Sequence, residues 1–230
     1  MANDVSELDA REKVCRISEY VASHTYSSAC VRFSNDPLGF FIGGMGRCEK
    51  MAHAESFMLN LIGIRSQVVS LVGEDHSFVE VYVAGQWMAS DPGYGYHLNT
   101  TVERGAARLA EFGGLSFVLV EGTAPPEFVT DRYVLTDTIV IRVLKNGVAY
   151  AGGSLLLKHE FRGFQLNPIQ VPLDGNGTVI LKMGSMQYNS NAGSTDSFYS
   201  IWVDDKDVNQ TVISYGMNRT VTIAISLTEP

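Results

Sequence analysis

One cysteine of the chain stands where a catalytic nucleophile would be expected. Cys48 follows the glycine-rich stretch Gly43-Gly44-Met45-Gly46, and from Cys48 onwards apolar residues recur at three- and four-residue spacing. This spacing predicts an amphipathic helix from Cys48 to Ile62, ended by Gly63. A thiol at a helix N-terminus lies at the positive end of the backbone dipole, which favours the nucleophilic thiolate. Taken alone, however, a cysteine is more often a small buried core residue.

A histidine and an aspartate follow in a predicted β-hairpin. Residues 75–83 are rich in β-branched and aromatic residues, Ala84-Gly85 offers a turn, and the returning segment ends in Asp91. With a two- or four-residue turn, Phe78 faces Asp91, and His76 becomes a diagonal neighbour of Asp91 about 7–8 Å away. One hydrogen bond between the side chains can bridge that gap. A three-residue turn would instead place the two side chains on opposite faces of the sheet.

Together, Cys48, His76 and Asp91 supply a nucleophile, a base and a group that orients the base. His76 alone would be explained as a loop histidine and Asp91 alone as a turn former. All three placements together favour a Cys-His-Asp triad.

The sequence between about residues 35 and 96 resembles the core of the transglutaminase-like superfamily. All three triad positions occur in the order typical of that family, and the resembling stretches are Gly46-Arg47-Cys48, Ala52 with Leu59 to Arg65, His76 to Tyr82, and Gly85 to Pro92. The resemblance implies an α+β papain/transglutaminase-like core with the cysteine at a helix N-terminus and the histidine and aspartate on an antiparallel sheet. Residues 115–133 resemble the segment that ends the core of peptide N-glycanases, but the pair of Cys-x-x-Cys motifs typical of zinc sites does not occur.

The superfamily includes transglutaminases, cysteine proteases, peptide N-glycanases and inactive members. The resemblance therefore implies an enzyme that acts on a protein or peptide amide through a thioester at Cys48. Attack by an amine would give acyl transfer, and attack by water would give hydrolysis. The alternative is a catalytically inactive transglutaminase-fold protein that serves as a binding or structural module.

Several residues are candidates for substrate contact. Gly46 would allow a substrate backbone to approach Cys48, and Trp87 shares a predicted sheet face with His76, where its ring could also pack on the Cys48 helix. In papain-like and transglutaminase-like enzymes a side chain before the nucleophile stabilises the oxyanion. No obvious counterpart occurs here, which leaves Asn35 and Tyr26 as candidates beside the backbone N–H of Cys48.

Composition narrows the possible partners. The chain has 230 residues, of which 45% are hydrophobic and 18% charged, so it can bury a sizeable core. A net charge of −8 without a cluster of Lys or Arg disfavours nucleic acid and anionic membranes as partners. Since there is neither a signal-peptide pattern nor a long apolar run, we expect no membrane insertion and a cytoplasmic protein, unless the chain is a fragment. No cofactor and no metal site are expected. The oligomeric state is left open.

The chain changes character after the predicted core. Helices are predicted at 4–24 and 102–112, an irregular segment at 25–42 and a strand at 64–72. Short strands then follow, which predicts an antiparallel β-sandwich: 115–121, 128–134, 137–145, 154–160, 168–173, 177–183, 197–203, 210–215 and 219–227. The predicted domains are a catalytic domain, 1–134, and an accessory β-sandwich, 135–230. Stretches at 143–147, 171–181 and 184–188 resemble transthyretin-like or carboxypeptidase-regulatory sandwiches.

Two smaller features allow more than one interpretation. Cys15 and Cys30 could form a disulfide that leaves Cys48 free, although nothing in their spacing requires it. The acidic loop of Asp204, Asp205 and Asp207 could hold calcium, but it lacks the glycine and the distal glutamate of an EF-hand loop. A solvated turn is the preferred interpretation of that loop.

Overall fold

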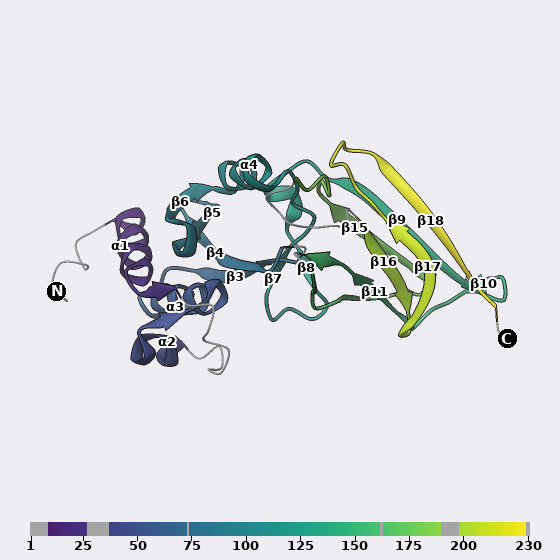
Figure 1. Cartoon of the computed structure of the whole chain (residues 1–230), viewed down its shortest axis with the longest axis horizontal. Coiled ribbons are helices and arrows are strands. Elements are labelled where there is room, and N and C mark those ends of the chain that lie inside the picture. The colour runs from purple at the N-terminus through teal and green to yellow at the C-terminus, as the bar shows by residue number, and fades with distance from the viewer. Residues whose placement is uncertain (1–8, 27–36, 73, 162, 190–197, 229–230) are drawn as a thin grey trace. The chain divides into compact units, whose positions relative to one another are not determined.

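The computed structural model of the chain describes residues 9–26, 37–72, 74–161, 163–189 and 198–228 (Figure 1). The chain divides into two compact units, of which the first comprises residues 1–70 and 76–104 and the second residues 71–75 and 105–230. This division along the chain differs from the predicted boundary near residue 135, because residues 105–134 belong to the same compact unit as the C-terminal strands. The functional domains 1–134 and 135–230 stay a prediction.

Three helices of the first unit precede its sheet. Helix α1 (Ala10–Ala22) begins with a capping box in which Asp9 and Glu12 each accept a hydrogen bond from the other's backbone N–H. Residues 4–8 of the predicted first helix lie outside the described residues. Helix α3 (Cys48–Leu61) agrees with its prediction, and Gly63 ends it with a φ of 77°.

Helix α2 (Pro37–Gly43) corrects the prediction of an irregular segment at 25–42. Pro37 and Gly39 suggest turns by their type alone, but proline is well suited to the first turn of a helix, where its missing N–H is not needed. Gly44, with a φ of 67°, ends this helix. Strand β2 (Met45–Gly46) then pairs in parallel with β1 (Thr25–Tyr26) before Cys48 opens α3.

The main sheet of the first unit has the strand order β6-β5-β4-β3. Its strands are β3 (Ser66–Leu71), β4 (His76–Val83), β5 (Gln86–Asp91) and β6 (Tyr96–Thr100), and the 3-10 helix η1 (Pro92–Tyr94) separates the last two. Because Val83 pairs with Gln86, the β4–β5 turn has two residues, and both central residues, Ala84 and Gly85, have positive φ. The two-residue turn agrees with the prediction.

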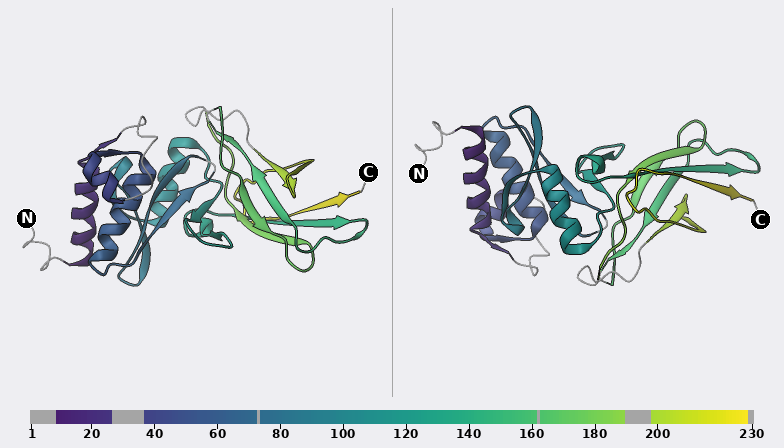
Figure 2. Two further views of the ribbon diagram at one scale, coloured as in Figure 1. Left: turned by 90° about the horizontal axis from the view of Figure 1, so that it is seen from below. Right: turned by 90° about the horizontal axis from the view of Figure 1, so that it is seen from above.

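The hydrophobic core of this unit lies on one face of β4 and β5. Val79, Val81, Val83 and Met88 point to this face and form one cluster with α1 and α3 residues that include Leu59. Figure 2 shows α1 and α3 beside the strands. The suggestion that the Trp87 ring packs on the Cys48 helix is therefore wrong. Since side chains alternate along a strand, α3 covers the aliphatic face, and His76 and Asp91 belong to the opposite face.

Helix α4 (Thr101–Phe112) agrees closely with the predicted helix at 102–112. Thr100 and Glu103 cap its start, because each side chain accepts a hydrogen bond from the backbone N–H of the other residue. Gly113, with a φ of 77°, ends it. The division between the two compact units falls within α4, between Arg104 and Gly105.

The second unit consists mostly of strands. They are β7 (Val118–Val120), β8 (Glu127–Phe128), β9 (Asp137–Lys145), β10 (Val148–Ala149), β11 (Ser154–Lys158), β12 (Glu160–Phe161), β13 (Phe164–Gln165), β14 (Ile169–Pro172), β15 (Thr178–Met183), β16 (Tyr199–Val203), β17 (Lys206–Val212) and β18 (Thr220–Leu227). Part of the predicted strand at 128–134 is instead the 3-10 helix η2 (Thr130–Arg132), in which Tyr133 donates a backbone hydrogen bond to Thr130.

Two four-stranded sheets of this unit share one hydrophobic core. One sheet has the order β10-β9-β15, with β18 also paired to β9, and the other has the order β14-β11-β16-β17. Ile139 and Ile141 of the first sheet and Leu155 and Ile201 of the second belong to a single buried cluster. The prediction of purely antiparallel strands is wrong for β18, which runs parallel to β9 along its whole length. Alternation alone cannot distinguish the direction of pairing.

Of the acidic loop, Asp204 and Asp205 form the tight turn between β16 and β17 with positive φ at both residues, whereas Asp207 lies in β17. Asp204 accepts hydrogen bonds from the Tyr150 hydroxyl and from the backbone N–H of Ser154. This agrees with the preferred interpretation of a turn. Among the described residues, no helix combines the length and the apolar character needed to cross a bilayer.

Candidate active site

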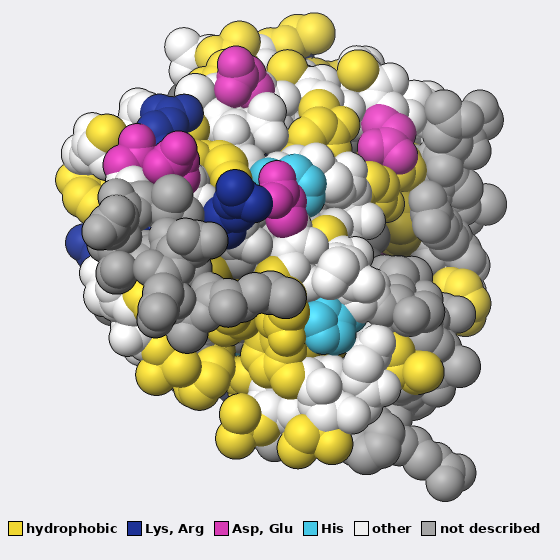
Figure 3. Space-filling model, turned by 90° about the vertical axis from the view of Figure 1, so that its left-hand side faces the viewer, with side chains coloured by type: hydrophobic (Ala, Val, Ile, Leu, Met, Phe, Trp, Pro, Cys, Tyr) yellow, Lys and Arg dark blue, Asp and Glu magenta, His cyan; other side chains and the backbone are white. Residues whose placement is uncertain are grey.

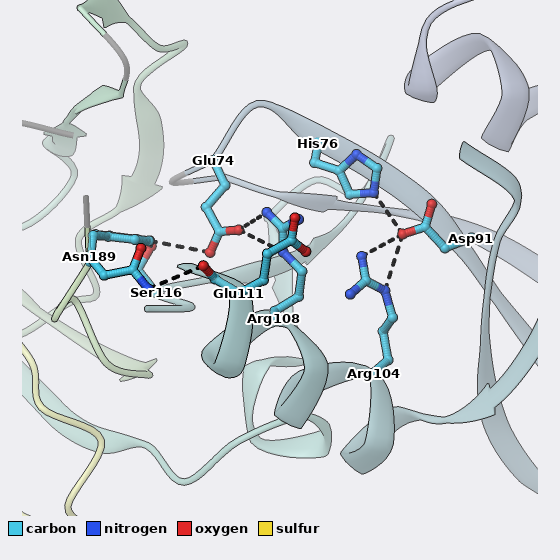
Figure 4. A network of polar contacts seen from close by, with 9 residues as sticks. Glu74, His76, Asp91, Arg104, Arg108, Glu111, Ser116 and Asn189 are labelled. Atoms are coloured by element: carbon cyan, nitrogen blue, oxygen red, sulfur yellow. Dashed lines mark hydrogen bonds and ion pairs between the residues drawn. The ribbon is translucent and has the colours of Figure 1, made fainter. Parts of the chain in front are cut away.

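His76 and Asp91 are joined by a buried hydrogen bond. The distance from His76 Nε2 to Asp91 Oδ2 is 2.8 Å, and Figure 4 shows both side chains directed toward each other. His76 is the first residue of β4 and Asp91 the last of β5. Val79 pairs with Ser90, so the same register continued by one residue sets Phe78 opposite Asp91. The expected diagonal contact between His76 and Asp91 is present.

Cys48 is the first residue of α3, where Arg47 provides the extended N-cap backbone. Its thiol is free and half-buried, and its side chain interacts with the imidazole of His76 and helps to raise the pKa of that group. Burial by itself would lower the pKa of His76. The charge of Asp91, the hydrogen bond to Asp91 and the interaction with Cys48 outweigh burial and raise that pKa to about 9. His76 therefore carries a proton at neutral pH, next to the thiol.

Asp91 is held by a second cation that the sequence analysis did not predict. Arg104, from α4, donates to Asp91 Oδ2 through Nε at 3.1 Å and Nη2 at 2.5 Å (Figure 4). Burial alone would raise the pKa of Asp91, but the charges of His76 and Arg104 and their hydrogen bonds lower it. Asp91 is thus an ionised carboxylate between two cations, although its side chain is only 1% exposed.

Aromatic rings surround these ionic groups. The Tyr94 ring lies edge-on to His76 with 4.9 Å between ring centroids, and the Phe78 ring stacks on His76 at 6.1 Å. The Arg104 guanidinium lies 5.4 Å from the Phe78 centroid and 4.9 Å from that of Tyr96. Since an arginine is favoured over the faces of aromatic rings, Phe78 contacts both cations of the site.

A second buried polar group lies on the side of α3. Glu55 Oε1 accepts a hydrogen bond of 2.5 Å from Ser90, the residue before Asp91, and Ser90 also contacts Ser18 of α1 at 3.1 Å. Burial raises the pKa of Glu55 to about 8, with a smaller contribution from the charge of Asp91. Glu55 is therefore a neutral acid at neutral pH that joins the Cys48 helix to the strand carrying Asp91.

The structure gives Gly46 a packing role. A Cβ on Gly46 would lie 2.7 Å from the Phe40 ring and 3.0 Å from Cβ of Lys50. Glycine is therefore required here by the close approach of α2 and α3. Whether Gly46 also contacts substrate stays a prediction.

Trp87 lies on the face of the sheet predicted for it. Its ring is 5.3 Å from that of Tyr82, its partner across the hairpin, and the Arg65 guanidinium lies 4.9 Å from the Trp87 centroid. The described contacts of Trp87 thus join it to an arginine and a tyrosine on the surface, four residues along β5 from Asp91. Its role in substrate binding stays a prediction.

The structure does not test the predicted oxyanion donors or the possible Cys15–Cys30 disulfide. The oxyanion candidate Asn35 and the possible disulfide partner Cys30 lie outside the described residues, and of Tyr26 the structure describes the backbone. Cys15 is a free thiol.

The surface around α1, α2 and α3 includes exposed hydrophobic side chains such as Leu38, Ile42 and Leu61. Figure 3 shows hydrophobic side chains spread over that face, with a group of them in its lower part, and charged side chains of both signs mostly in its upper half.

Comparison with known proteins supports the transglutaminase-like resemblance. The family model described as the transglutaminase-like superfamily matches residues 1–92, which include Cys48, His76 and Asp91. This confirms the resemblance for that part of the chain. No curated protein matches the chain. The resemblance of the C-terminal strands to transthyretin-like or carboxypeptidase-regulatory sandwiches stays a prediction.

Two solved structures were also found. A Cytophaga hutchinsonii protein described as a candidate cysteine protease is 16% identical, with a TM-score of 0.36 over 42% of this chain and 37% of its own. A structure described as a TGase is 19% identical, with a TM-score of 0.34 over 40% of this chain and 28% of its own. The chain thus spans well under half the length of either protein.

Residues 1–92 are therefore similar to the transglutaminase-like superfamily, whose family model they match. In this matched part of the chain, the His76 imidazole and the Asp91 carboxylate share a buried hydrogen bond, and the Cys48 thiol interacts with the same imidazole.

Proposed function

We propose that this chain is a thiol acyltransferase or hydrolase that acts on a protein or peptide amide. The proposal rests mainly on one observation: the buried His76–Asp91 hydrogen bond, at 2.8 Å, belongs to an imidazole with which the Cys48 side chain also interacts. An imidazolium beside a thiol favours the thiolate, which is the form that attacks a carbonyl carbon. The geometry thus has the three groups that covalent catalysis by cysteine needs.

In the proposed reaction, Cys48 Sγ attacks the amide carbonyl carbon and a tetrahedral intermediate forms. The backbone N–H of Cys48, at the start of α3, would donate to the oxyanion. His76 gives its proton to the leaving nitrogen as the C–N bond breaks, which releases an amine and leaves a thioester on Cys48. Asp91 keeps the imidazole oriented and balances its charge.

The thioester then reacts with a second nucleophile. His76, now neutral, takes a proton from the attacking amine or water, and the C–S bond breaks to restore the Cys48 thiolate and the His76 imidazolium. An amine gives a new amide, as in a transglutaminase, and water gives a carboxylic acid, as in a protease or amidase.

The test is the rate of alkylation of each cysteine by iodoacetamide, followed in the full chain by mass spectrometry. We expect Cys48 to react more than about tenfold faster than Cys15 near neutral pH, because burial and the charge of Glu19 raise the pKa of Cys15. His76→Ala should remove the difference. Similar, slow rates at all three cysteines would contradict the proposal and favour the alternative, an inactive transglutaminase-like protein with a binding or structural role.

If Cys48 is activated, a glutamine-containing peptide and a fluorescent primary amine separate the two outcomes. Incorporation of the amine into the peptide indicates acyl transfer. Release of ammonia or cleavage of the peptide without incorporation indicates hydrolysis. Cys48→Ala is the control for both measurements, since it removes the group that forms the thioester.

A further inference from the structure

We propose that Arg104 is a positioning residue that sets the proton affinity of His76 through Asp91. This inference rests on the proposed function, because it assigns Arg104 to the same group of interacting side chains. Arg104 lies outside the residues matched by the family model, which end at residue 92.

The first support is the way in which Asp91 is shared. One oxygen, Oδ2, accepts from His76 Nε2 at 2.8 Å and from Arg104 Nε and Nη2 at 3.1 and 2.5 Å. Two donors of one planar guanidinium on the same oxygen restrict rotation of the carboxylate. Arg104 therefore holds Oδ2 in the position from which it accepts the hydrogen bond of His76.

The second support is charge. The side chains of Asp91 and Arg104 are each only 1% exposed, so water screens their interaction poorly. With Asp91 as its only ionic partner, a protonated His76 would hold its proton very tightly and would donate it poorly to a leaving amine. Arg104 cancels the negative charge of Asp91, which keeps His76 basic enough to carry a proton and acidic enough to release it.

The third support is that the position of Arg104 is fixed independently. Rings of Phe78, Tyr94 and Tyr96 lie within 4.9 to 5.7 Å of its guanidinium carbon. Among the described residues of this unit, the titratable and charged groups around His76 are Cys48 from α3, Asp91 from β5, Tyr94 from η1 and Arg104 from α4, with neutral Glu55 bonded to Ser90 next to Asp91. Of these, Arg104 is the permanent cation.

The test compares Arg104→Met, Arg104→Gln and Arg104→Lys in the full chain. The readouts are the pH profile of Cys48 alkylation and the titration of His76 followed by its ring NMR signals. Removing a buried positive charge from the neighbourhood of an imidazolium should raise the pH at which His76 loses its proton by about one unit or more in the Met and Gln variants. Arg104→Lys keeps the charge and should retain a profile close to that of the wild type.

Arg108→Met is the matched control. Arg108 lies one turn further along α4 and pairs with a different carboxylate, that of Glu74. A purely structural effect of losing a buried arginine should appear in both Met variants, whereas a shifted His76 titration should appear only at Arg104. If Arg104→Met does not fold, as judged by circular dichroism, the Gln variant decides, because it retains hydrogen-bond donors.

The outcomes separate this inference from the proposed function. A wild-type Cys48 that reacts no faster than Cys15 contradicts the proposed function itself. A reactive wild-type Cys48, together with unshifted His76 titrations in the Met and Gln variants, overturns only the role of Arg104. A downward shift in those variants overturns it as well.

Discussion

Helix α4 provides two buried arginines, each bonded to a carboxylate, and the two pairs differ in what else the carboxylate contacts. In the first unit, Arg104 shares Asp91 with His76. In the second unit, Arg108 donates through Nε and Nη2 to Glu74, which also accepts from the Tyr188 hydroxyl at 3.5 Å. Both arginines are about 1% exposed.

The third group decides what each pair does. His76 has a pKa of about 9 and gives up its proton in the proposed reaction, so the charge of Asp91 would act on that step. Burial and the charge of Glu74 raise the pKa of Tyr188 well above its usual value, so Tyr188 stays neutral over the physiological range. Under the proposed function, the Arg104 pair would bear on catalysis because His76, which shares its carboxylate, carries a transferable proton, whereas the Arg108 pair would stabilise the fold alone.

The largest expected loss of stability comes from breaking the Arg108–Glu74 pair alone. Arg108→Met leaves the Glu74 charge buried without its arginine, and we expect it to lower the free energy of unfolding by about 3–5 kcal/mol. Urea denaturation at neutral pH measures this loss. In the folded protein, the pH profile of Cys48 alkylation should remain that of the wild type. A shifted profile would show that the Glu74 pair also influences the proposed active site.

The free energy of unfolding should depend on pH through the His76–Asp91 pair. Its pKa of about 9 lies above the value of about 6.5 expected for an unfolded histidine. The contribution of the imidazolium is therefore fully present below about pH 6.5 and is lost as the pH rises through 9, about 3 kcal/mol in total. Urea denaturation between pH 6 and pH 10 checks this, and His76→Gln should remove the loss.

Glu55 must be separated from His76 in that experiment. Its pKa is also raised, to about 8, so its neutral form stabilises the fold most below about pH 4.5 and this contribution is lost as the pH rises through 8. The measurement is therefore best made in a Glu55→Gln background. If His76→Gln leaves the pH dependence of the free energy of unfolding unchanged in that background, the pKa of His76 is not raised.

A smaller effect is expected when both members of a pair are replaced. Glu74→Leu with Arg108→Met removes both buried charges, and we expect it to recover about 2 kcal/mol of the loss caused by Arg108→Met alone. Asp91→Leu with Arg104→Met should recover less, because it also removes the carboxylate partner of His76, and its Cys48 should react as slowly as Cys15. Retained fast alkylation in the second double variant would contradict the difference between the pairs.

The smallest effect concerns an arginine on the surface. Arg65 lies 4.9 Å from the Trp87 ring centroid and 5.6 Å from that of Tyr82. Arg65→Met should cost about 0.5–1 kcal/mol, because an exposed cation–π contact is weak. The pH profile of Cys48 alkylation should not change. Comparing the substrate KM of Arg65→Met and Trp87→Phe then tests whether this surface contacts substrate.

Much of the candidate site could be predicted because it depends on local patterns. Helical periodicity after Cys48, the strand pattern around His76 and the Ala84-Gly85 turn fix which residues share a face, and hence the contact between His76 and Asp91. Helix α2 was missed because Pro37 and Gly39 favour turns and helix starts alike. The parallel pairing of β18 with β9 was missed because alternation is the same in either direction.

Arg104 and Glu55 could not have been assigned in this way. On an isolated amphipathic helix, Arg104 and Arg108 would be interpreted as a solvated polar face, and Glu55 interrupts an otherwise apolar stripe. The signal available was the type of residue at an unexpected position: a glutamate among core positions, and two arginines one helical turn apart. The partners of these side chains lie on other elements of the fold, so only the tertiary structure shows which contacts they make.

The sequence by itself determined the identities and order of Cys48, His76 and Asp91, the helix that begins at the cysteine and the hairpin that joins the other two. These follow from periodicity and turn chemistry over short stretches of chain. The tertiary structure decided that Asp91 lies between two cations, that Glu55 stays protonated and that the aliphatic face of β4 meets the Cys48 helix. Those properties depend on burial and on distances between segments remote in the chain, because an ionic group changes its proton affinity only when neighbours replace its water.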